Sequence, residues 1–154
     1  MEQSSFEQRY HRQLILPGFG PDAQQRLTAA KVLVIGAGGL GCPVLQYLVA
    51  AGIGHLAIAD QDTVSLSNLQ RQILYGESDL GQLKATVAKE RLVSLNSGVK
   101  LVSLPVHWTP ADCIRYFPEY DIIIDATDNF ATRYMINDAA VLLGKPVVYG
   151  SVSR

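Results

Sequence analysis

The sequence contains little cysteine. Only Cys42 and Cys113 occur in 154 residues, and they do not form a C-x-x-C pair. Two cysteines cannot supply a four-ligand zinc site on their own, so such a centre is excluded within this chain. With so few thiols the cytosol is the default compartment, and we expect a cytoplasmic protein with both cysteines reduced.

An excess of one charge and long apolar runs are also missing. The 13 Lys and Arg residues nearly balance the 14 Asp and Glu residues, which leaves a net charge of −1. This balance gives no general attraction to nucleic acid or to an anionic membrane, so we expect neither as a partner. The apolar stretches are strand-sized and predict no transmembrane helix. Residues 1–5 lack a basic region followed by an apolar one, so no signal peptide is expected.

What is present is an alternation of buried strands and helices. A hydrophobic content of 48% is ordinary for a globular α/β protein. Continuous apolar runs predict strands buried on both faces of a parallel sheet, and segments with helical spacing separate them. The expected strands are 31–35, 55–59, 100–106, 121–124 and 146–149, and the expected helices are two within 6–29 (split at 17–21), then 41–51, 65–75, 82–95 and 130–143. This order predicts a doubly wound, Rossmann-like, mostly parallel sheet with an N-terminal helical extension.

The organisation along the chain follows from this pattern. We expect a helical extension over residues 1–30 and a Rossmann-like ATP-binding domain over residues 31–154. No helix follows the fifth expected strand before the sequence stops at Arg154. The domain therefore looks truncated at its C-terminal end, and we expect a segment of a longer protein.

A glycine motif lies between the first strand and its helix. Gly36-x-Gly38-x-x-Gly41 permits a tight turn, close approach of phosphate to backbone N–H groups, and close packing of helix on strand. The N-terminus of the helix adds partial positive charge. Asp60, at the end of the second strand, can accept hydrogen bonds from ribose hydroxyls. The alternative is that Gly38 and Gly39 only form a turn.

Further polar residues narrow the chemistry. The segment 67–72 reads Ser-Asn-Leu-Gln-Arg-Gln, Lys84 follows it, and 127–129 reads Thr-Asp-Asn. This set suits an enzyme that clamps ATP while a carboxylate attacks it, because fixed cations stabilise the added negative charge. Asp128 suits Mg²⁺, which prefers a carboxylate together with phosphate and water. A neutral nicotinamide needs no such cluster.

Each charged residue also has a plainer interpretation. Lys84 could belong to a solvated helix face. Arg71 could pair with Glu77 or Asp79 on the surface. Asp128 could merely cap the helix that is expected to start at Phe130.

Several motifs occur together in one order. They are Arg9-Tyr10-x-Arg12-Gln13, the glycine motif, Asp60 to Asp62, the segment 67–72, Lys84 and Thr127-Asp128-Asn129. In this combination the chain, from about Tyr10 to Arg154, closely resembles the ThiF/MoeB/HesA family, the bacterial relatives of ubiquitin-activating enzymes. The resemblance implies an adenylyltransferase that uses ATP and Mg²⁺ to activate the C-terminal glycine of a small ubiquitin-fold sulfur-carrier protein, in molybdopterin or thiamine biosynthesis.

The resemblance also assigns roles to residues. It implies a homodimer in which Arg12 reaches the partner's active site. Catalytic roles are implied for Arg12, Arg71, Lys84 and Asp128, with Asp128 as the ligand of Mg²⁺. The implied nucleotide-binding residues are Gly36, Gly38, Gly39, Gly41, Asp60, Ser67, Asn68, Leu69, Gln70, Arg71, Lys84, Asp128 and Asn129.

The chain lacks features that family members carry further on. Their continuation holds two C-x-x-C pairs for structural zinc, and in some members a sulfur-handling or thioester-forming cysteine. Zinc is therefore expected only in a full-length parent, since this chain has no such ligands. Two alternatives stay open: an NAD-dependent oxidoreductase that uses the same glycine motif, and a truncated, non-catalytic dimerising module.

Overall fold

A computed structural model describes residues 4–151 of the chain. Residues 152–154, with which the predicted nucleotide domain ends, lie outside the described residues. Five parallel strands form one sheet in the order β3-β2-β1-β4-β5. The strands are β1 Lys31–Ile35, β2 His55–Ala59, β3 Lys100–Leu104, β4 Ile122–Asp125 and β5 Val147–Tyr149.

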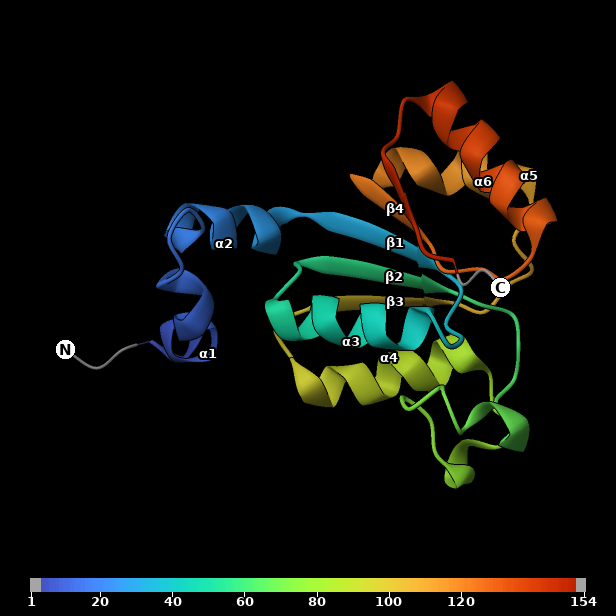
Figure 1. Ribbon diagram of the computed structural model, residues 1–154, viewed down its shortest axis with the longest axis horizontal. Helices are drawn as coiled ribbons and strands as arrows, with labels where there is room; N and C mark the ends of the chain where they lie inside the picture. Colours follow the sequence, from blue (N-terminus) through green and yellow to red (C-terminus); the bar gives the residue numbers. More distant parts are fainter. Residues whose placement is uncertain (1–3, 152–154) are drawn as a thin grey trace.

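The helices cover both faces of this sheet, as the doubly wound pattern predicts (Figure 1). Helices α3, Gly41–Ala51, and α4, Lys84–Leu95, lie on one face, and α5, Pro110–Tyr116, and α6, Phe130–Leu143, lie on the other. Two buried apolar clusters fill the spaces between the sheet and these helix layers. The predicted fold class is confirmed.

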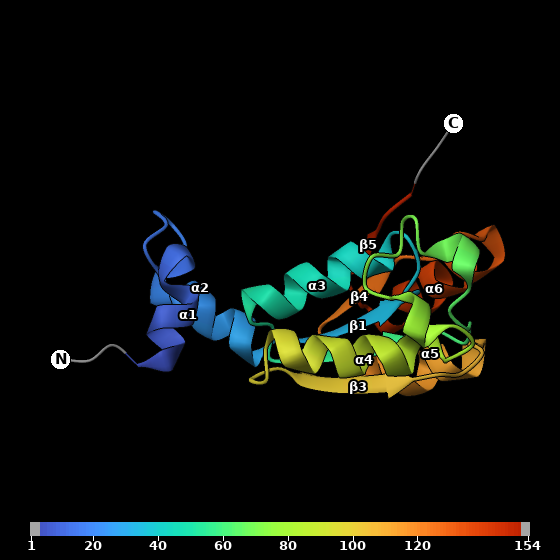
Figure 2. The same cartoon turned by 90° about the horizontal axis from the view of Figure 1, so that it is seen from below.

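The N-terminal extension consists of α1, Ser5–Leu14, and α2, Gly20–Ala29. Figures 1 and 2 show both helices beyond the ends at which the strands begin. Polar contacts hold α1 there, because the amide of Gln13 donates to Gln24 Oε1 and to Ala51 O, the last residue of α3. The division into an extension and a nucleotide domain stays a prediction. None of the helices in the described range is long and apolar enough to cross a membrane.

One expectation about local structure was wrong. The segment 65–75 is not a helix: a single 3₁₀ turn, Leu66–Asn68, is followed by irregular turns. Its buried side chains are Gln72, Leu74 and Tyr75, a spacing that suits contact with a loop rather than one face of a helix. A capping box between Thr109 and Asp112 starts α5, a helix for which no bounds were predicted.

Candidate nucleotide-binding site

The candidate site lies where β1, β2 and β4 end. The chain leaves β1 toward α3 on one face and leaves β4 toward α6 on the other, so the two connections diverge at the carboxyl edge of the sheet (Figure 1). In open α/β sheets, ligands bind in the crevice at such a topological switch point. The glycine motif follows β1 and the Thr127-Asp128-Asn129 segment follows β4. The fold therefore places the two predicted motifs on either side of the switch point.

Two of the glycines are required by close packing. Gly36 has φ +97°, and a Cβ atom there would lie 2.7 Å from Ala126 O. A Cβ atom on Gly41 would lie 2.0 Å from Gly36 O. A side chain at Gly36 would push the loop away from the β4 connection, and one at Gly41 would push the start of α3 away from the end of β1.

The other two glycines face the predicted polar segment. A Cβ atom on Gly38 would lie 3.5 Å from Gln72 Nε2, and one on Gly39 would lie 3.4 Å from Arg71 Cδ, both without a severe clash. The structure therefore brings the segment 67–72 against the glycine loop, although some thirty residues separate them in sequence. The alternative that Gly38 and Gly39 only form a turn does not account for this contact.

Asp60 is tied to the glycine loop. Its Oδ2 accepts a hydrogen bond of 2.7 Å from Ala37 N–H, and its Oδ1 accepts one of 2.8 Å from Asp62 N–H. Burial raises the pKa of the Asp60 carboxyl above its usual value, while these two N–H donors oppose the rise. Each carboxylate oxygen keeps a second lone pair, so these bonds leave Asp60 able to accept from a ribose hydroxyl.

Lys84 is buried beside this carboxylate pair. Only 5% of the residue is exposed, and its Nζ lies 3.0 Å from Asp62 Oδ2. An antiparallel bridge between Thr63 and Leu83 brings the two segments together. The interpretation of Lys84 as a residue on a solvated helix face was therefore wrong.

The same bridge closes a loop at its base. Val64 N–H donates to Gln82 O, and Gly81 N–H donates to Val64 O, each at 2.9 Å. Residues 65–81, which include the predicted polar segment, thus form a loop between β2 and α4 whose two ends are joined. We call this segment the closed loop.

Arg71 is an exposed residue of the closed loop. Its Nη1 donates to Ser67 O at 3.3 Å, within the same segment. The surface pairing considered for Arg71 was wrong, because Asp79 pairs with Arg91 and no carboxylate within residues 4–151 forms an ion pair with Arg71. The guanidinium charge is therefore available to an anionic ligand beside the glycine loop.

Asp128 is exposed and does not cap a helix. The N-cap of α6 is Asn129, whose side chain accepts from Thr132 N–H at 2.9 Å. The capping interpretation of Asp128 was therefore wrong. Asp128 comes directly after Ala126 and Thr127 in the chain, and the backbone of these two residues approaches Gly36.

Two residues to which no role was assigned from the sequence hold this segment in place. Asp125 is buried and accepts hydrogen bonds from the N–H and the hydroxyl of Thr127, at 2.9 and 2.7 Å. Arg133 donates from Nε and Nη2 to Thr127 O and from Nη2 to Gly150 O. Arg133 lies one helical turn after Asn129, and that spacing was the available signal.

Unpaired polar groups at the loop indicate what it can bind. Among residues 4–151, no group accepts a hydrogen bond from the N–H of Gly38, Gly39 or Leu40. The buried Gln72 Oε1 likewise has no partner there. Free N–H groups at the start of a helix form an anion site. No set of three or more His, Cys, Asp or Glu side chains in the described range could hold a metal by itself.

Arg12 is the one predicted site residue that the structure places elsewhere. It is an exposed residue of α1, which contacts the last residues of α3 and α4, through Gln13 to Ala51 and Arg9 to Leu95. The glycine loop and Lys84 stand at the first residues of those same helices. Within one chain, Arg12 and the other predicted catalytic residues therefore lie at opposite ends of two helices.

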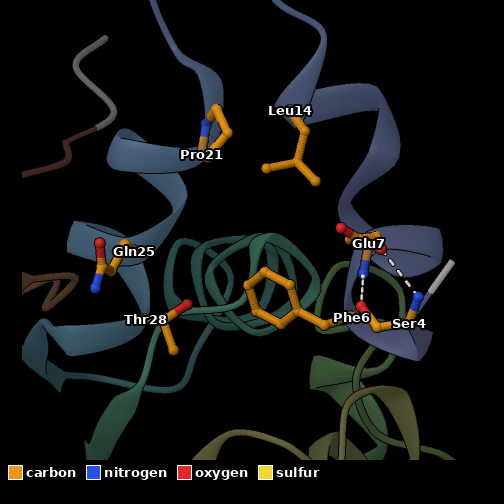
Figure 3. A pocket seen from close by; sticks show the side chains of 7 residues that line it. All are labelled: Ser4, Phe6, Glu7, Leu14, Pro21, Gln25 and Thr28. Atoms are coloured by element: carbon orange, nitrogen blue, oxygen red, sulfur yellow. Dashed lines mark hydrogen bonds between the residues drawn. The ribbon is translucent and has the colours of Figure 1, made fainter.

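A hollow of about 380 Å³ also lies between α1 and α2 (Figure 3). Phe6, Leu14 and Pro21 give it an apolar lining, and the carboxylate of Glu7 in its wall is occupied by the N-cap of α1. It offers no cluster of free charges for a nucleotide.

Comparison with known proteins identifies one family and relatives that are named as adenylyltransferases. Residues 10–154 match the model of the ThiF family. The chain is 54% identical to the sulfur carrier protein adenylyltransferase of Thermus thermophilus over 94% of its length. It is 51% identical to the probable adenylyltransferase/sulfurtransferase MoeZ of Mycobacterium tuberculosis over 95% of its length. The chain spans 53% and 37% of the lengths of these two relatives.

Solved structures agree on the fold. The E. coli tRNA N6-threonylcarbamoyladenosine dehydratase TcdA, in complex with ATP, superposes with a TM-score of 0.89 at 26% identity, covering 99% of this chain and 65% of that one. E. coli MccB, with AMPCPP and MccA, superposes with a TM-score of 0.79 at 30% identity, covering 86% of this chain and 41% of that one. Both structures contain an adenine nucleotide.

Proposed function

Because the chain belongs to the ThiF family, we propose that it acts as an ATP-dependent adenylyltransferase on the C-terminal glycine carboxylate of a ubiquitin-fold sulfur-carrier protein. The substrate class rests on relatives named as sulfur carrier protein adenylyltransferases, which extend well beyond the matched region. A role in molybdenum cofactor or thiamine biosynthesis, and a cytoplasmic location, belong to the same proposal.

One observation carries the proposal: two cationic side chains, the buried Lys84 and Arg71, which has no ion pair among residues 4–151, lie near the free N–H groups of the glycine loop. Arg71 packs over Gly39, and the buried Lys84 lies beside the Asp60–Asp62 turn. A triphosphate offers these groups more negative charge than the pyrophosphate of NAD, and the nicotinamide ring of NAD offers none. The comparisons lend no support to an NAD-dependent oxidoreductase.

In the proposed reaction an oxygen of the glycine carboxylate attacks the α-phosphorus of ATP. The bond from that phosphorus to the bridging oxygen breaks, and pyrophosphate leaves with its electron pair. Negative charge accumulates on the phosphoryl oxygens, where Arg71 and Lys84 would stabilise it. Asn68 would contact the nucleotide, and Asp60 would accept from the ribose.

The donor set is compatible with Mg²⁺. This ion commonly binds through one or two carboxylates, substrate phosphates and water, so the single exposed carboxylate of Asp128 is sufficient. When bound, Mg²⁺ would neutralise charge on the phosphates. We include in the proposal a homodimer in which Arg12 of one protomer completes the site of its partner. Within one chain, Arg12 and the other predicted catalytic residues lie at opposite ends of α3 and α4.

The first test is nucleotide preference. Titration calorimetry of this chain should show tighter binding of ATP with Mg²⁺ than of NAD. Tighter binding of NAD would overturn the assignment.

The second test is the reaction itself. A sulfur-carrier protein that ends in glycine should support ATP–pyrophosphate exchange, and the same carrier without its last glycine should not. Arg71→Ala should lower the exchange rate about 100-fold, because a contact that strengthens in the transition state is worth roughly 3 kcal/mol. The matched control is Arg26→Ala, on the exposed side of α2. Equal rates in the two variants would remove Arg71 from the mechanism.

A further inference from the structure

The hydroxyl of Tyr75 lies beneath the glycine loop. It donates a hydrogen bond of 2.8 Å to Ala37 O, and the thiol of Cys42 lies 3.3 Å from the same oxygen. Tyr75 is 6% exposed and Ala37 is fully buried. Burial raises the pKa of Tyr75 far above its usual value, so the hydroxyl stays protonated and remains a donor.

This bond determines the direction of a neighbouring N–H group. The C=O of Ala37 and the N–H of Gly38 belong to one planar trans peptide, so they point in opposite directions. When Tyr75 holds the carbonyl toward the protein interior, the N–H of Gly38 is turned outward, where no acceptor within residues 4–151 meets it. Asp60 holds the N–H of Ala37, so this residue is fixed on both sides.

The same hydroxyl also lies near the start of α4, the helix that carries Lys84. Tyr75 Oη is 3.4 Å from the backbone oxygen of Lys84, the first residue of α4. One side chain from the closed loop therefore stands between the glycine loop and the start of α4. A residue that only filled space in the core would need no hydroxyl at this point.

We propose that Tyr75 is a positioning residue for phosphate binding: its hydroxyl sets the peptide between Ala37 and Gly38 so that the Gly38 N–H faces the nucleotide phosphates. The inference rests on the proposed ATP-binding function. Without the hydroxyl, the Ala37 carbonyl keeps only the weak thiol donor of Cys42, and the peptide can rotate away from its binding orientation.

The test compares two buried tyrosines. Tyr75→Phe removes the hydroxyl and keeps the ring. Tyr10→Phe is the matched control, because Tyr10 is also 6% exposed and its hydroxyl accepts one hydrogen bond, of 2.8 Å from Asn96, at the far end of α4. Calorimetry should show ATP–Mg²⁺ affinity about tenfold weaker in Tyr75→Phe and unchanged in Tyr10→Phe. Competition by adenosine, which has no phosphate, should be the same in both.

A second measurement does not depend on nucleotide. In amide spectra of the free protein, the Gly38 resonance should shift or broaden in Tyr75→Phe and keep its position in Tyr10→Phe. Equal ATP affinity in the two variants, or an unperturbed Gly38 amide, would overturn the role of Tyr75 while ATP binding by the wild type still stands. Absence of ATP binding in the wild type would instead overturn the proposed function, and this inference with it.

Discussion

Replacing Lys84 by methionine should separate ligand binding from stability. The substitution keeps an unbranched stem of similar length in the buried position and removes only the ammonium charge. The partner of that charge, Asp62, has a side chain that is 61% exposed, compared with 6% for Lys84. Water can therefore hydrate the Asp62 carboxylate once the ion pair is gone.

The stability cost follows from this asymmetry. A pair with one well-hydrated partner contributes about 0–1 kcal/mol, and the methionine avoids the cost of burying an ammonium group. We expect Lys84→Met to change the free energy of unfolding by less than about 1 kcal/mol. A lost charge-assisted contact with phosphate, in contrast, costs about 2–3 kcal/mol, which corresponds to a roughly 30- to 150-fold weaker affinity for ATP.

Two measurements check this prediction: calorimetric titration with ATP–Mg²⁺ and equilibrium unfolding in urea. The matched control is Lys89→Met, an exposed lysine on the same helix. If Lys84→Met binds ATP as tightly as Lys89→Met does, Lys84 has no part in nucleotide binding. A loss of several kcal/mol of stability without loss of affinity would show that the buried ion pair serves the fold alone.

Three further outcomes are expected. Asp128→Asn should weaken the Mg²⁺ dependence of ATP binding and leave the melting temperature unchanged, since the neighbouring residue caps α6; a lower melting temperature with normal metal dependence would contradict this. Mixing inactive Arg12→Ala with inactive Lys84→Ala should restore about a quarter of wild-type exchange activity through mixed dimers with one intact site, and no recovery despite subunit exchange would exclude sharing of Arg12. Burial raises the pKa of the Asp60 carboxyl above its usual 3.8 in the folded state, so folding favours the protonated carboxyl. The resulting contribution to stability is complete below pH 3.8 and is lost as pH rises through the folded-state pKa. The unfolding free energy of the wild type minus that of Asp60→Asn should therefore fall as pH rises through this range, and a difference that is independent of pH would contradict the raised pKa.

The parts of the fold that depend on local pattern were predictable from sequence. The strand 31–35 and the helix 41–51 were predicted with the bounds that the structure has, because Gly36 ends an unbroken apolar run and Gly41 and Gly52 mark the two ends of the helix. The start of α6 at Phe130 was also predicted correctly. That start already makes residue 129 the N-cap, so the capping alternative for Asp128 could have been rejected from the sequence.

The closed loop was beyond such reasoning. Its conformation depends on contacts with residues far away in sequence, such as Tyr75 with Ala37 and Gln72 with Gly38. The alternative of a solvated Lys84 arose because charged residues follow it in the helix, whereas its ion pair is with a residue 22 positions earlier. Local periodicity carries no information on these contacts, because they join residues that become neighbours only when the chain folds.

The joined base lets the closed loop vary in length outside its site residues. Its two ends meet through backbone bonds between Val64, Gly81 and Gln82, so residues added between them need not shift β2 or α4. Lengthening such a segment adds closure entropy only logarithmically. Residues inserted away from Asn68, Arg71 and Tyr75 would therefore leave Lys84 and the glycine loop in position, whereas exchange of the whole segment would also exchange residues of the proposed site.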